Sequence, residues 1–363
     1  MSHPIVDMLK AYFKNETPEI DSTLEAELIS KAKEQALLPF LYYVYHKKEY
    51  RSYYITSSIA QEEFLKLQTE LTGFFNEANI KHLFLKGSIL YQLYPDPALR
   101  TRGDIDIVVE NKRFNEARQI LLDHGYQMLS IESQHHIEFI KNKSIVELHF
   151  LLFDDFRSTS YFKDPFELAY PIDKCLYTFT NENFFVYCLY HFAIHLRMGA
   201  GLRYILDFYY MLKKWDMDKD LLHRKIEEIG YTRLYHNILN AIYFLTEEEL
   251  DEFPKEDINF FIEYLVKSGI HGFGEESQRE EKGFGIKNNK LKAIIAGTFM
   301  LNKPFRISKY PRLGKHWFTY PLCLIHRIIY LLCTQTKRLF KLLFSKKNKV
   351  TKEEKDFFNK LGV

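Results

Sequence analysis

The chain has 363 residues, enough to bury a large core in about two domains. Its 50 Lys and Arg residues nearly balance its 48 Asp and Glu residues, and the net charge of +2 excludes a global basic field for nucleic acid. The four cysteines show no CxxC spacing, which predicts reduced thiols and excludes a structural zinc site. The N-terminus lacks the basic start and the long apolar stretch of a signal peptide, so the expected location is the cytoplasm.

The predicted elements divide the chain into three parts. Residues 1–80 predict an N-terminal helical segment, because apolar residues recur at helical spacing and the stretch 57–79 carries its charges on one face. Residues 81–155 alternate strand and helix patterns and predict a core built around a sheet. Residues 156–363 predict a larger helical domain, since the pattern is almost wholly helical from position 183.

The pattern over residues 81–155 predicts a small mixed β-sheet. The expected strands are residues 82–86, 105–109, 126–131, 137–140 and 144–150, and the expected helix is 114–124. The fold class expected for the whole chain is therefore α+β, a small mixed sheet flanked by an N-terminal helical segment and a larger C-terminal helical domain.

Two carboxylates are expected on one face of a buried strand. The run from Ile105 to Val109 is β-branched and apolar, so Asp104 and Asp106, two residues apart, must project to the same side. At roughly 6 to 7 Å between their Cβ atoms they can share one or two divalent cations. Two adjacent acids repel each other, and a cation relieves that repulsion.

A turn and a later strand place further polar groups near this pair. Lys86-Gly87-Ser88 follows a short strand, and the amides of the helix that starts near Ile89 are expected to face an anion. The segment Arg100-Thr101-Arg102-Gly103 brings two guanidinium groups beside Asp104. Glu147 and His149 alternate on one face of the strand 144–150, so the sequence offers a third carboxylate.

This ordered set resembles the polymerase-β-like nucleotidyltransferase superfamily, whose signature is a Gly-Gly or Gly-Ser turn, an acid-x-acid strand and a third acid on a later strand. Within it the chain is most similar to a bacterial group with Leu-Lys-Gly, Tyr-Pro, Arg, Asp-x-Asp and acid-Leu-His motifs. The matching residues are Leu85-Lys86-Gly87, Tyr94-Pro95, Arg100, Asp104-Ile105-Asp106 and Glu147-Leu148-His149. The similarity extends to His191, His195, residues 202–207 and residues 311–327, and so covers most of the chain.

The resemblance departs from the superfamily pattern in two places. Residues 89–103 make the spacing between Ser88 and Asp104 a little longer than is common, and Glu147 stands where Asp is frequent. Glu can still bind a metal, with one more methylene of reach.

The resemblance implies metal-dependent transfer of a nucleoside monophosphate from an NTP, expected to be ATP, to a hydroxyl group, with release of pyrophosphate. Asp104, Asp106 and Glu147 would be catalytic and would bind Mg²⁺, with Mn²⁺ as an alternative. The nucleotide would be bound by Lys86, Gly87, Ser88, Arg100 and Arg203. His149 and Asp207 would orient groups that make these contacts.

Two other functions fit the same residues. One is a noncatalytic nucleotide-binding or regulatory protein, although a binding module has no need for three converging carboxylates. The other is a phosphotransferase that uses the γ-phosphate. Pyrophosphate as the product indicates nucleotidyl transfer, ADP indicates a kinase, and neither indicates binding alone.

Several histidines and one ion pair have two interpretations. His191 and His195, at i and i+4, favour packing or hydrogen bonding over substrate contact. Arg203 and Asp207 have the same spacing, which is typical of a surface ion pair but would also let Asp207 orient Arg203 toward phosphate. His135 and His136 precede a strand that would place them on opposite faces.

Two late segments bear on partners. The glycine-bearing segment 271–287 lacks the context of a dinucleotide site and is expected to be a mobile loop or a lid. The apolar run 322–333 is too short to span a bilayer. The cationic helix expected at 337–347 is expected to pack on the domain with its lysines in solvent, in preference to contacting a membrane surface or nucleic acid. Because basic residues cluster only there, a small molecule or a protein or peptide hydroxyl is favoured as acceptor over a polynucleotide.

Overall fold

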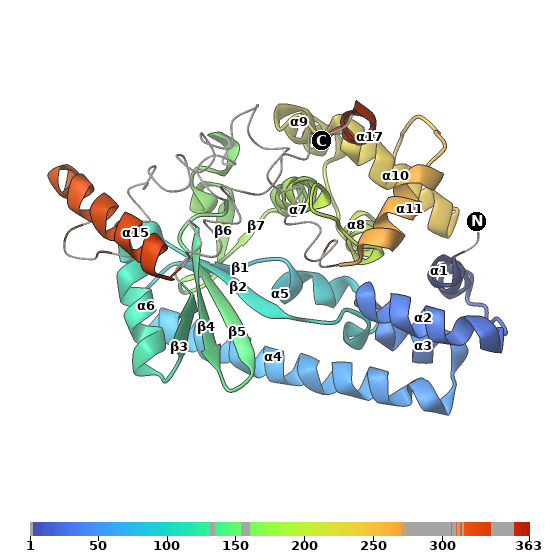
Figure 1. Cartoon of the computed structure of the whole chain (residues 1–363), viewed down its shortest axis with the longest axis horizontal. Helices are drawn as coiled ribbons and strands as arrows, with labels where there is room; N and C mark the ends of the chain where they lie inside the picture. Colours follow the sequence, from blue (N-terminus) through green and yellow to red (C-terminus); the bar gives the residue numbers. More distant parts are fainter. Residues whose placement is uncertain are drawn as a thin grey trace.

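The computed structural model describes residues 3–130, 135–153, 160–270, 316–334 and 352–363, together with residues 272, 306, 310 and 313. A mixed β-sheet lies between a long helix on one side and a group of helices on the other (Figure 1). The α+β class predicted from the sequence is confirmed. The predicted segments 271–287 and 337–347 lie outside the described residues, apart from residue 272.

Seven strands form one sheet in the order β3-β4-β5-β2-β1-β7-β6. They are β1 (His82–Phe84), β2 (Asp104–Val109), β3 (Gln127–Ser130), β4 (His136–Lys141), β5 (Ser144–His149), β6 (Ala169–Asp173) and β7 (Leu176–Phe179). The pairs β2 with β5 and β1 with β7 are parallel, and the other neighbours are antiparallel. The last two strands were not predicted, because only one of their nine side chains is buried and their apolar alternation is weak.

Helices precede, interrupt and follow the sheet. Before and within it lie α1 (Pro4–Lys14), α2 (Ser22–Glu34), α3 (Leu38–Tyr45), α4 (Arg51–Glu77), α5 (Gly87–Leu90) and α6 (Phe114–Asp123). After it come α7 (Asn181–Leu196), α8 (Leu202–Lys214), α9 (Lys219–Glu228), α10 (Thr232–Thr246), α11 (Asn259–Ser268), α15 (Tyr320–Thr334) and α17 (Lys352–Leu361). Among the described residues the short 3₁₀ helices are η1 (Lys48–Tyr50), η2 (Tyr91–Leu93), η3 (Pro97–Leu99), η4 (Asn111–Arg113), η5 (Ser160–Phe162), η6 (Pro165–Glu167) and η7 (Trp317–Thr319).

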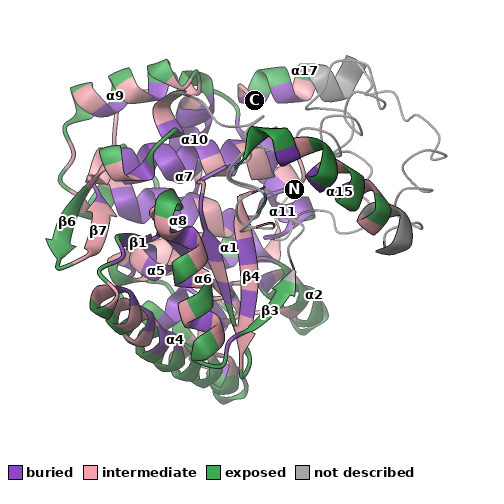
Figure 2. Cartoon of the chain, turned by 90° about the vertical axis from the view of Figure 1, so that its left-hand side faces the viewer, coloured by how far each residue is buried: buried purple, intermediate pink, exposed green. Residues whose placement is uncertain are grey.

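The two faces of the sheet are buried against different helices. Ile105, Ile107 and Val109 of β2 join one hydrophobic cluster with apolar residues of α4 and α6. Leu83 of β1 and Val108 of β2 belong to a second, larger cluster with α7, α8 and the N-terminal helices. Figure 2 shows that α7 is buried on most of its surface, whereas α4 exposes a long outer side. Because β2 is covered on both faces, a polar residue on it is held in a defined position.

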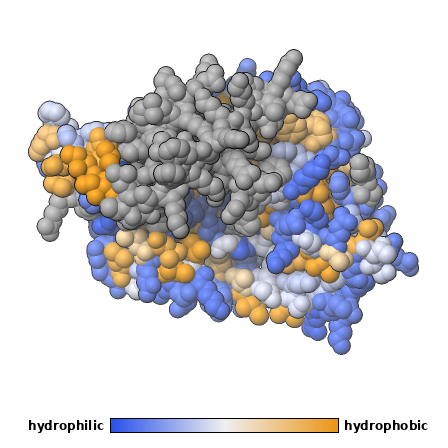
Figure 3. All heavy atoms as spheres, in the orientation of Figure 1, coloured by the Kyte–Doolittle hydropathy of each residue, from blue (hydrophilic) through white to orange (hydrophobic). Residues whose placement is uncertain are grey.

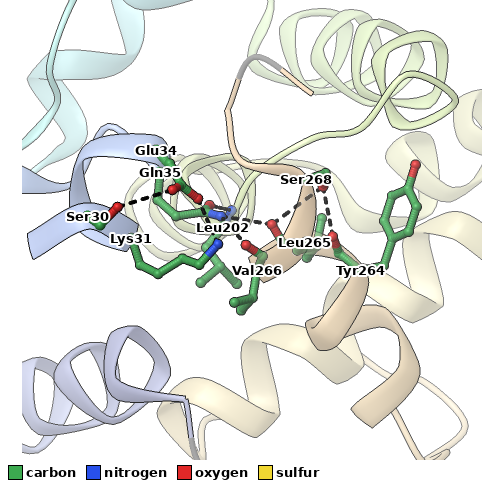
Figure 4. Close-up of polar contacts among 9 residues, drawn as sticks. All are labelled: Ser30, Lys31, Glu34, Gln35, Leu202, Tyr264, Leu265, Val266 and Ser268. Atoms are coloured by element: carbon green, nitrogen blue, oxygen red, sulfur yellow. Dashed lines mark hydrogen bonds and ion pairs between the residues drawn. The ribbon is translucent and has the colours of Figure 1, made fainter. Parts of the chain in front are cut away.

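A buried glutamine joins the N-terminal helices to the helices that follow the sheet. Gln35, at the end of α2, donates from Nε2 to the carbonyls of Leu265 (2.9 Å) and Val266 (3.2 Å) in α11. Its Oε1 accepts from the backbone N–H of Leu202 (2.6 Å), the first residue of α8, as Figure 4 shows. A Cβ on Gly201 would lie 2.5 Å from that oxygen, so this approach requires glycine.

We expect Gln35→Ala to destabilise the fold by about 2–4 kcal/mol, because it removes the buried acceptor of the Leu202 N–H and the side-chain donor to the Leu265 and Val266 carbonyls. The midpoint of urea denaturation measures the loss. Gln119→Ala is the matched control, because Gln119 is exposed and bonds only to Asp123 on its own helix. Equal midpoints for the two variants would contradict a stabilising role for Gln35.

The helix α15 presents an apolar outer face. Leu322, Ile325 and Ile329 are each more than half exposed, and Figure 3 shows hydrophobic residues gathered at the left edge of the molecule, where Figure 1 places this helix. Within the described part of the chain, no helix is both long and apolar enough to cross a membrane.

Candidate functional site

The strand register brings two acids side by side. Asp106 of β2 lies opposite Glu147 of the parallel strand β5, and Asp104 lies opposite Ile145. Residues that pair across a sheet share a face, and side chains alternate along a strand. Asp104 and Asp106 of β2 therefore point toward α7 and α8, while Ile105 and Ile107 face α4 and α6. The position of these acids follows from the period-two pattern of the sequence.

A strained turn places a lysine over Asp106. Lys86 has φ +44° and ψ −116°, a backbone conformation that costs a non-glycine residue about 1–3 kcal/mol. Its Nζ lies 2.8 Å from Asp106 Oδ1, and the carboxylate is almost completely buried. Burial disfavours the charge of Asp106, but the Lys86 ammonium and His149 outweigh it and hold the pKa of Asp106 well below its usual range.

His149 links the two carboxylates. Its Nε2 lies 3.1 Å from Asp106 Oδ1 and 3.2 Å from Glu147 Oε2, and its ring is buried. Burial opposes protonation of this ring, but hydrogen bonds to both acids raise the pKa of His149 to about 9. Burial also raises the pKa of Glu147. In the absence of a metal, the His149 proton and the Lys86 ammonium therefore neutralise the acids.

The ligand atoms of Asp106, Glu147 and His149 all lie within 4.8 Å of one another, so these three residues can converge on one cation. Asp104 is in none of the groups of this kind that occur among the described residues, but it lines the same pocket as Asp106. The three acids predicted from the sequence therefore share one region, and His149, for which an orienting role was expected, contacts two of them.

His135 and His136 lie next to the acids as well. Their ring centroids lie 5.4 Å and 4.9 Å from that of His149, and 4.5 Å from each other. The prediction that a strand would separate them is wrong, because β4 begins at His136 and His135 lies in the bend before it. Burial, followed by repulsion from the other two rings, lowers the pKa of His136 to about 2, so His136 is a neutral imidazole.

The turn after Lys86 is packed closely against Arg100, so it leaves less room for a ligand than the sequence indicated. A Cβ on Gly87 would lie 2.7 Å from Arg100 Nη1, so glycine is required here by close packing. The helix α5 has only four residues, and the amides of Ile89 and Leu90 already donate to Lys86 O. The expectation that these amides face an anion is therefore wrong. Ser88 is buried, and its Oγ lacks a hydrogen-bond partner in the described part of the chain.

Arg100 is held by a residue from α8. Its Nε and Nη2 donate to the two carboxylate oxygens of Asp207 at 2.8 and 2.9 Å, and Tyr94 donates its hydroxyl to the same carboxylate at 2.8 Å. The i, i+4 pairing of Asp207 with Arg203 is not formed. Arg203 Nη1 instead donates to the carbonyl of Thr101 (3.2 Å) and to its Oγ1 (3.4 Å).

A pocket of about 600 Å³, including its open mouth, is lined by residues of β2, of the Lys86-Gly87 turn and of the helices α4, α7 and α8. Its charged lining residues are Lys86, Arg100, Arg102, Asp104, Asp106, Arg203 and Asp207. His191 and Cys188 of α7 also line it, and the His191 ring lies 4.2 Å from that of His195. Burial, with Lys86 and His195 nearby, lowers the pKa of His191 well below its usual value.

Arg102 is the charged pocket residue that the sequence interpretation placed beside Asp104 without giving it a function. Its guanidinium carbon lies 3.9 Å from the ring centroid of Phe64 and 4.0 Å from that of Tyr91. The only sequence signal was its position two residues before Asp104, because Phe64 and Tyr91 are brought to it from α4 and η2 by the fold.

Comparison with known protein families shows to which family the chain belongs. Residues 21–243, more than half of the chain, match the family described as uncharacterised nucleotidyltransferase. The chain belongs to this family. The match begins at the N-cap of α2, ends in α10 and includes all seven strands, so it covers every element that lines the pocket. No curated protein and no solved structure matches the chain. Membership in this nucleotidyltransferase family indicates a transferase that acts on nucleotidyl groups.

Proposed function

We propose that the protein transfers a nucleoside monophosphate group from an NTP to a hydroxyl group of a small molecule, protein or peptide. The observation that supports it most directly is the convergence of Asp106, Glu147 and His149 beside the Lys86-Gly87 turn in a chain of nucleotidyltransferase type. In the reaction the acceptor oxygen bonds to the α-phosphorus, the bond to the β-phosphate oxygen breaks, and pyrophosphate leaves.

The donor atoms fit a divalent cation. Carboxylates suit Mg²⁺ and Mn²⁺, and an imidazole nitrogen such as that of His149 suits Mn²⁺ better than Mg²⁺. Asp104, Asp106 and Glu147 would hold the cation, which supplies neutralisation of phosphoryl charge and a lowered pKa for the acceptor hydroxyl. A cation there would take over the neutralising role of Lys86, whose ammonium lies at the pocket and would be free to contact a phosphate oxygen.

The protein's own residues would contribute to catalysis mainly by positioning the nucleotide and the acceptor. The strained Lys86-Gly87 turn brings the backbone to the pocket wall beside the guanidinium of Arg100, and the packed strands hold the acids in one orientation. The charge on the leaving pyrophosphate would be stabilised by cationic side chains in a site from which water is largely excluded.

The test uses the full-length protein with Mg²⁺ and each of the four NTPs, labelled in parallel at the α- or the γ-phosphate. A cell extract, divided into small-molecule and protein fractions, supplies the acceptor. We expect α-label in one fraction and γ-label in pyrophosphate. Transfer of γ-label with formation of ADP would show a phosphotransferase, and no transfer of either label in any fraction would contradict an enzymatic role.

A further inference from the structure

Arg102 carries a buried positive charge that no carboxylate neutralises. Its guanidinium carbon lies over the rings of both Phe64 and Tyr91. Its Nε, Nη1 and Nη2 are all buried without a well-formed hydrogen bond to any residue that the structure describes, although the Tyr91 hydroxyl is near enough to favour the charge. Contact with aromatic rings stabilises the charge of a guanidinium but does not provide acceptors for its N–H donors, which lie in the plane of the guanidinium group.

Arg203 of α8 shows a similar deficit in the same pocket. Only its Nη1 has acceptors, both on Thr101, and its Nε is buried without one among the described residues. The carboxylate that could have served it, Asp207, is occupied by Arg100 and Tyr94. Burial, followed by repulsion from Arg100, lowers the pKa of both Arg102 and Arg203.

The charges of the pocket are therefore unevenly compensated. Lys86 is paired with Asp106, and Arg100 with Asp207, while Arg102 and Arg203 have no acid within ion-pair distance among the described residues. An uncompensated buried charge is costly and persists where a ligand supplies the opposite charge. A planar guanidinium with free donors matches the oxygens of a phosphate group, which it can bind through two parallel hydrogen bonds.

We propose that Arg102 and Arg203 bind the β- and γ-phosphates of the nucleotide, whereas Arg100 is a structural residue that holds α8 against the Lys86-Gly87 turn. The identity of the anion as a triphosphate rests on the proposed function. Phe64 and Tyr91 hold Arg102 in place, so its N–H groups are oriented before the ligand arrives.

The test measures binding of inorganic tripolyphosphate in the presence of Mg²⁺ by isothermal titration calorimetry, with the full-length protein. Arg102→Met keeps a long side chain against the two rings and removes the charge. We expect its affinity to fall roughly 10- to 100-fold, as for loss of a charge-assisted hydrogen-bonded contact. Its melting temperature without tripolyphosphate should stay the same or rise, because an uncompensated charge has been removed.

Arg224→Met is the matched control. Arg224 is an exposed residue of α9 outside the pocket, so this variant makes the same change in net charge and should bind tripolyphosphate like the wild type. Unchanged affinity in folded Arg102→Met, or a lowered melting temperature with unchanged affinity, would overturn the proposal and make Arg102 a packing residue. Should Arg102→Met not fold, Arg203→Met carries the test with the same expected loss, and unchanged affinity there overturns it.

Tripolyphosphate contains neither a nucleoside nor an acceptor, so its binding is measured independently of transfer. Arg102-dependent binding without any nucleotidyl transfer would contradict the proposed function and leave a polyphosphate-binding site. The protein could instead release pyrophosphate from NTP but bind tripolyphosphate equally well with and without Arg102. That result would overturn only the assignment of Arg102 and Arg203 as phosphate-binding residues. A wild-type protein that does not bind tripolyphosphate would overturn that assignment as well.

Discussion

Asp106→Asn is expected to lower nucleotidyl transfer by roughly 10³-fold or more, because it removes the buried carboxylate on which Lys86, His149 and a cation would converge. Asparagine has nearly the same shape, so packing against the sheet should survive. Release of labelled pyrophosphate measures the rate, and far-ultraviolet circular dichroism with thermal melting checks the fold.

Asp123→Asn is the control for this variant. Asp123 is an exposed residue at the end of α6, so the same chemical change there should leave transfer unaffected. Near-wild-type turnover in folded Asp106→Asn would remove Asp106 from the catalytic assignment. A loss of turnover that merely followed a loss of folded protein would contradict it too, because the effect would then be structural.

The largest effect on stability is expected from Asp207→Asn. This change leaves Arg100 buried without a counter-charge, beside Arg102 and Arg203, which also lack one. Breaking a buried ion pair from one side typically costs about 3–5 kcal/mol. The loss is measured as the shift of the urea denaturation midpoint at constant slope.

Glu249→Gln gives the comparison for Asp207→Asn. The Glu249–Lys255 pair is about half exposed on both sides, so its removal should cost no more than about 1 kcal/mol. A double variant, Arg100→Met with Asp207→Leu, should be more stable than Asp207→Asn, because it removes both buried charges together. Equal losses in Asp207→Asn and Glu249→Gln would show that the Arg100–Asp207 pair does not hold α8 in place.

Much of the fold around the site could be predicted from local patterns. The alternation of apolar residues and acids over β2 predicted a buried strand with two acids on one face, because the side-chain period of a strand is two. The long helix predicted at 57–79 is α4, which begins earlier, at Arg51, because the 3₁₀ turn before it continues directly into the helix. The exposed edge strands β6 and β7 lacked such a pattern and were missed.

The partners of the charged side chains could not be predicted in the same way. Local spacing suggested that Asp207 would pair with Arg203 four residues away, an interaction worth only a few tenths of a kcal/mol on a helix surface. Asp207 instead contacts Arg100, 107 positions away in the sequence, because the fold buries both groups and a buried charge requires a close partner.

The sequence by itself determined the residue types of the site, the strands that carry the acids and the resemblance to nucleotidyltransferases. Periodicity and turn residues suffice for these, since they act over a few neighbouring positions. Only the tertiary structure decided that His149 bridges Asp106 and Glu147, that Arg100 is neutralised, and that Arg102 and Arg203 are not. The physical reason is that burial sets the energy of a charge, and burial depends on elements that the chain brings together from distant positions.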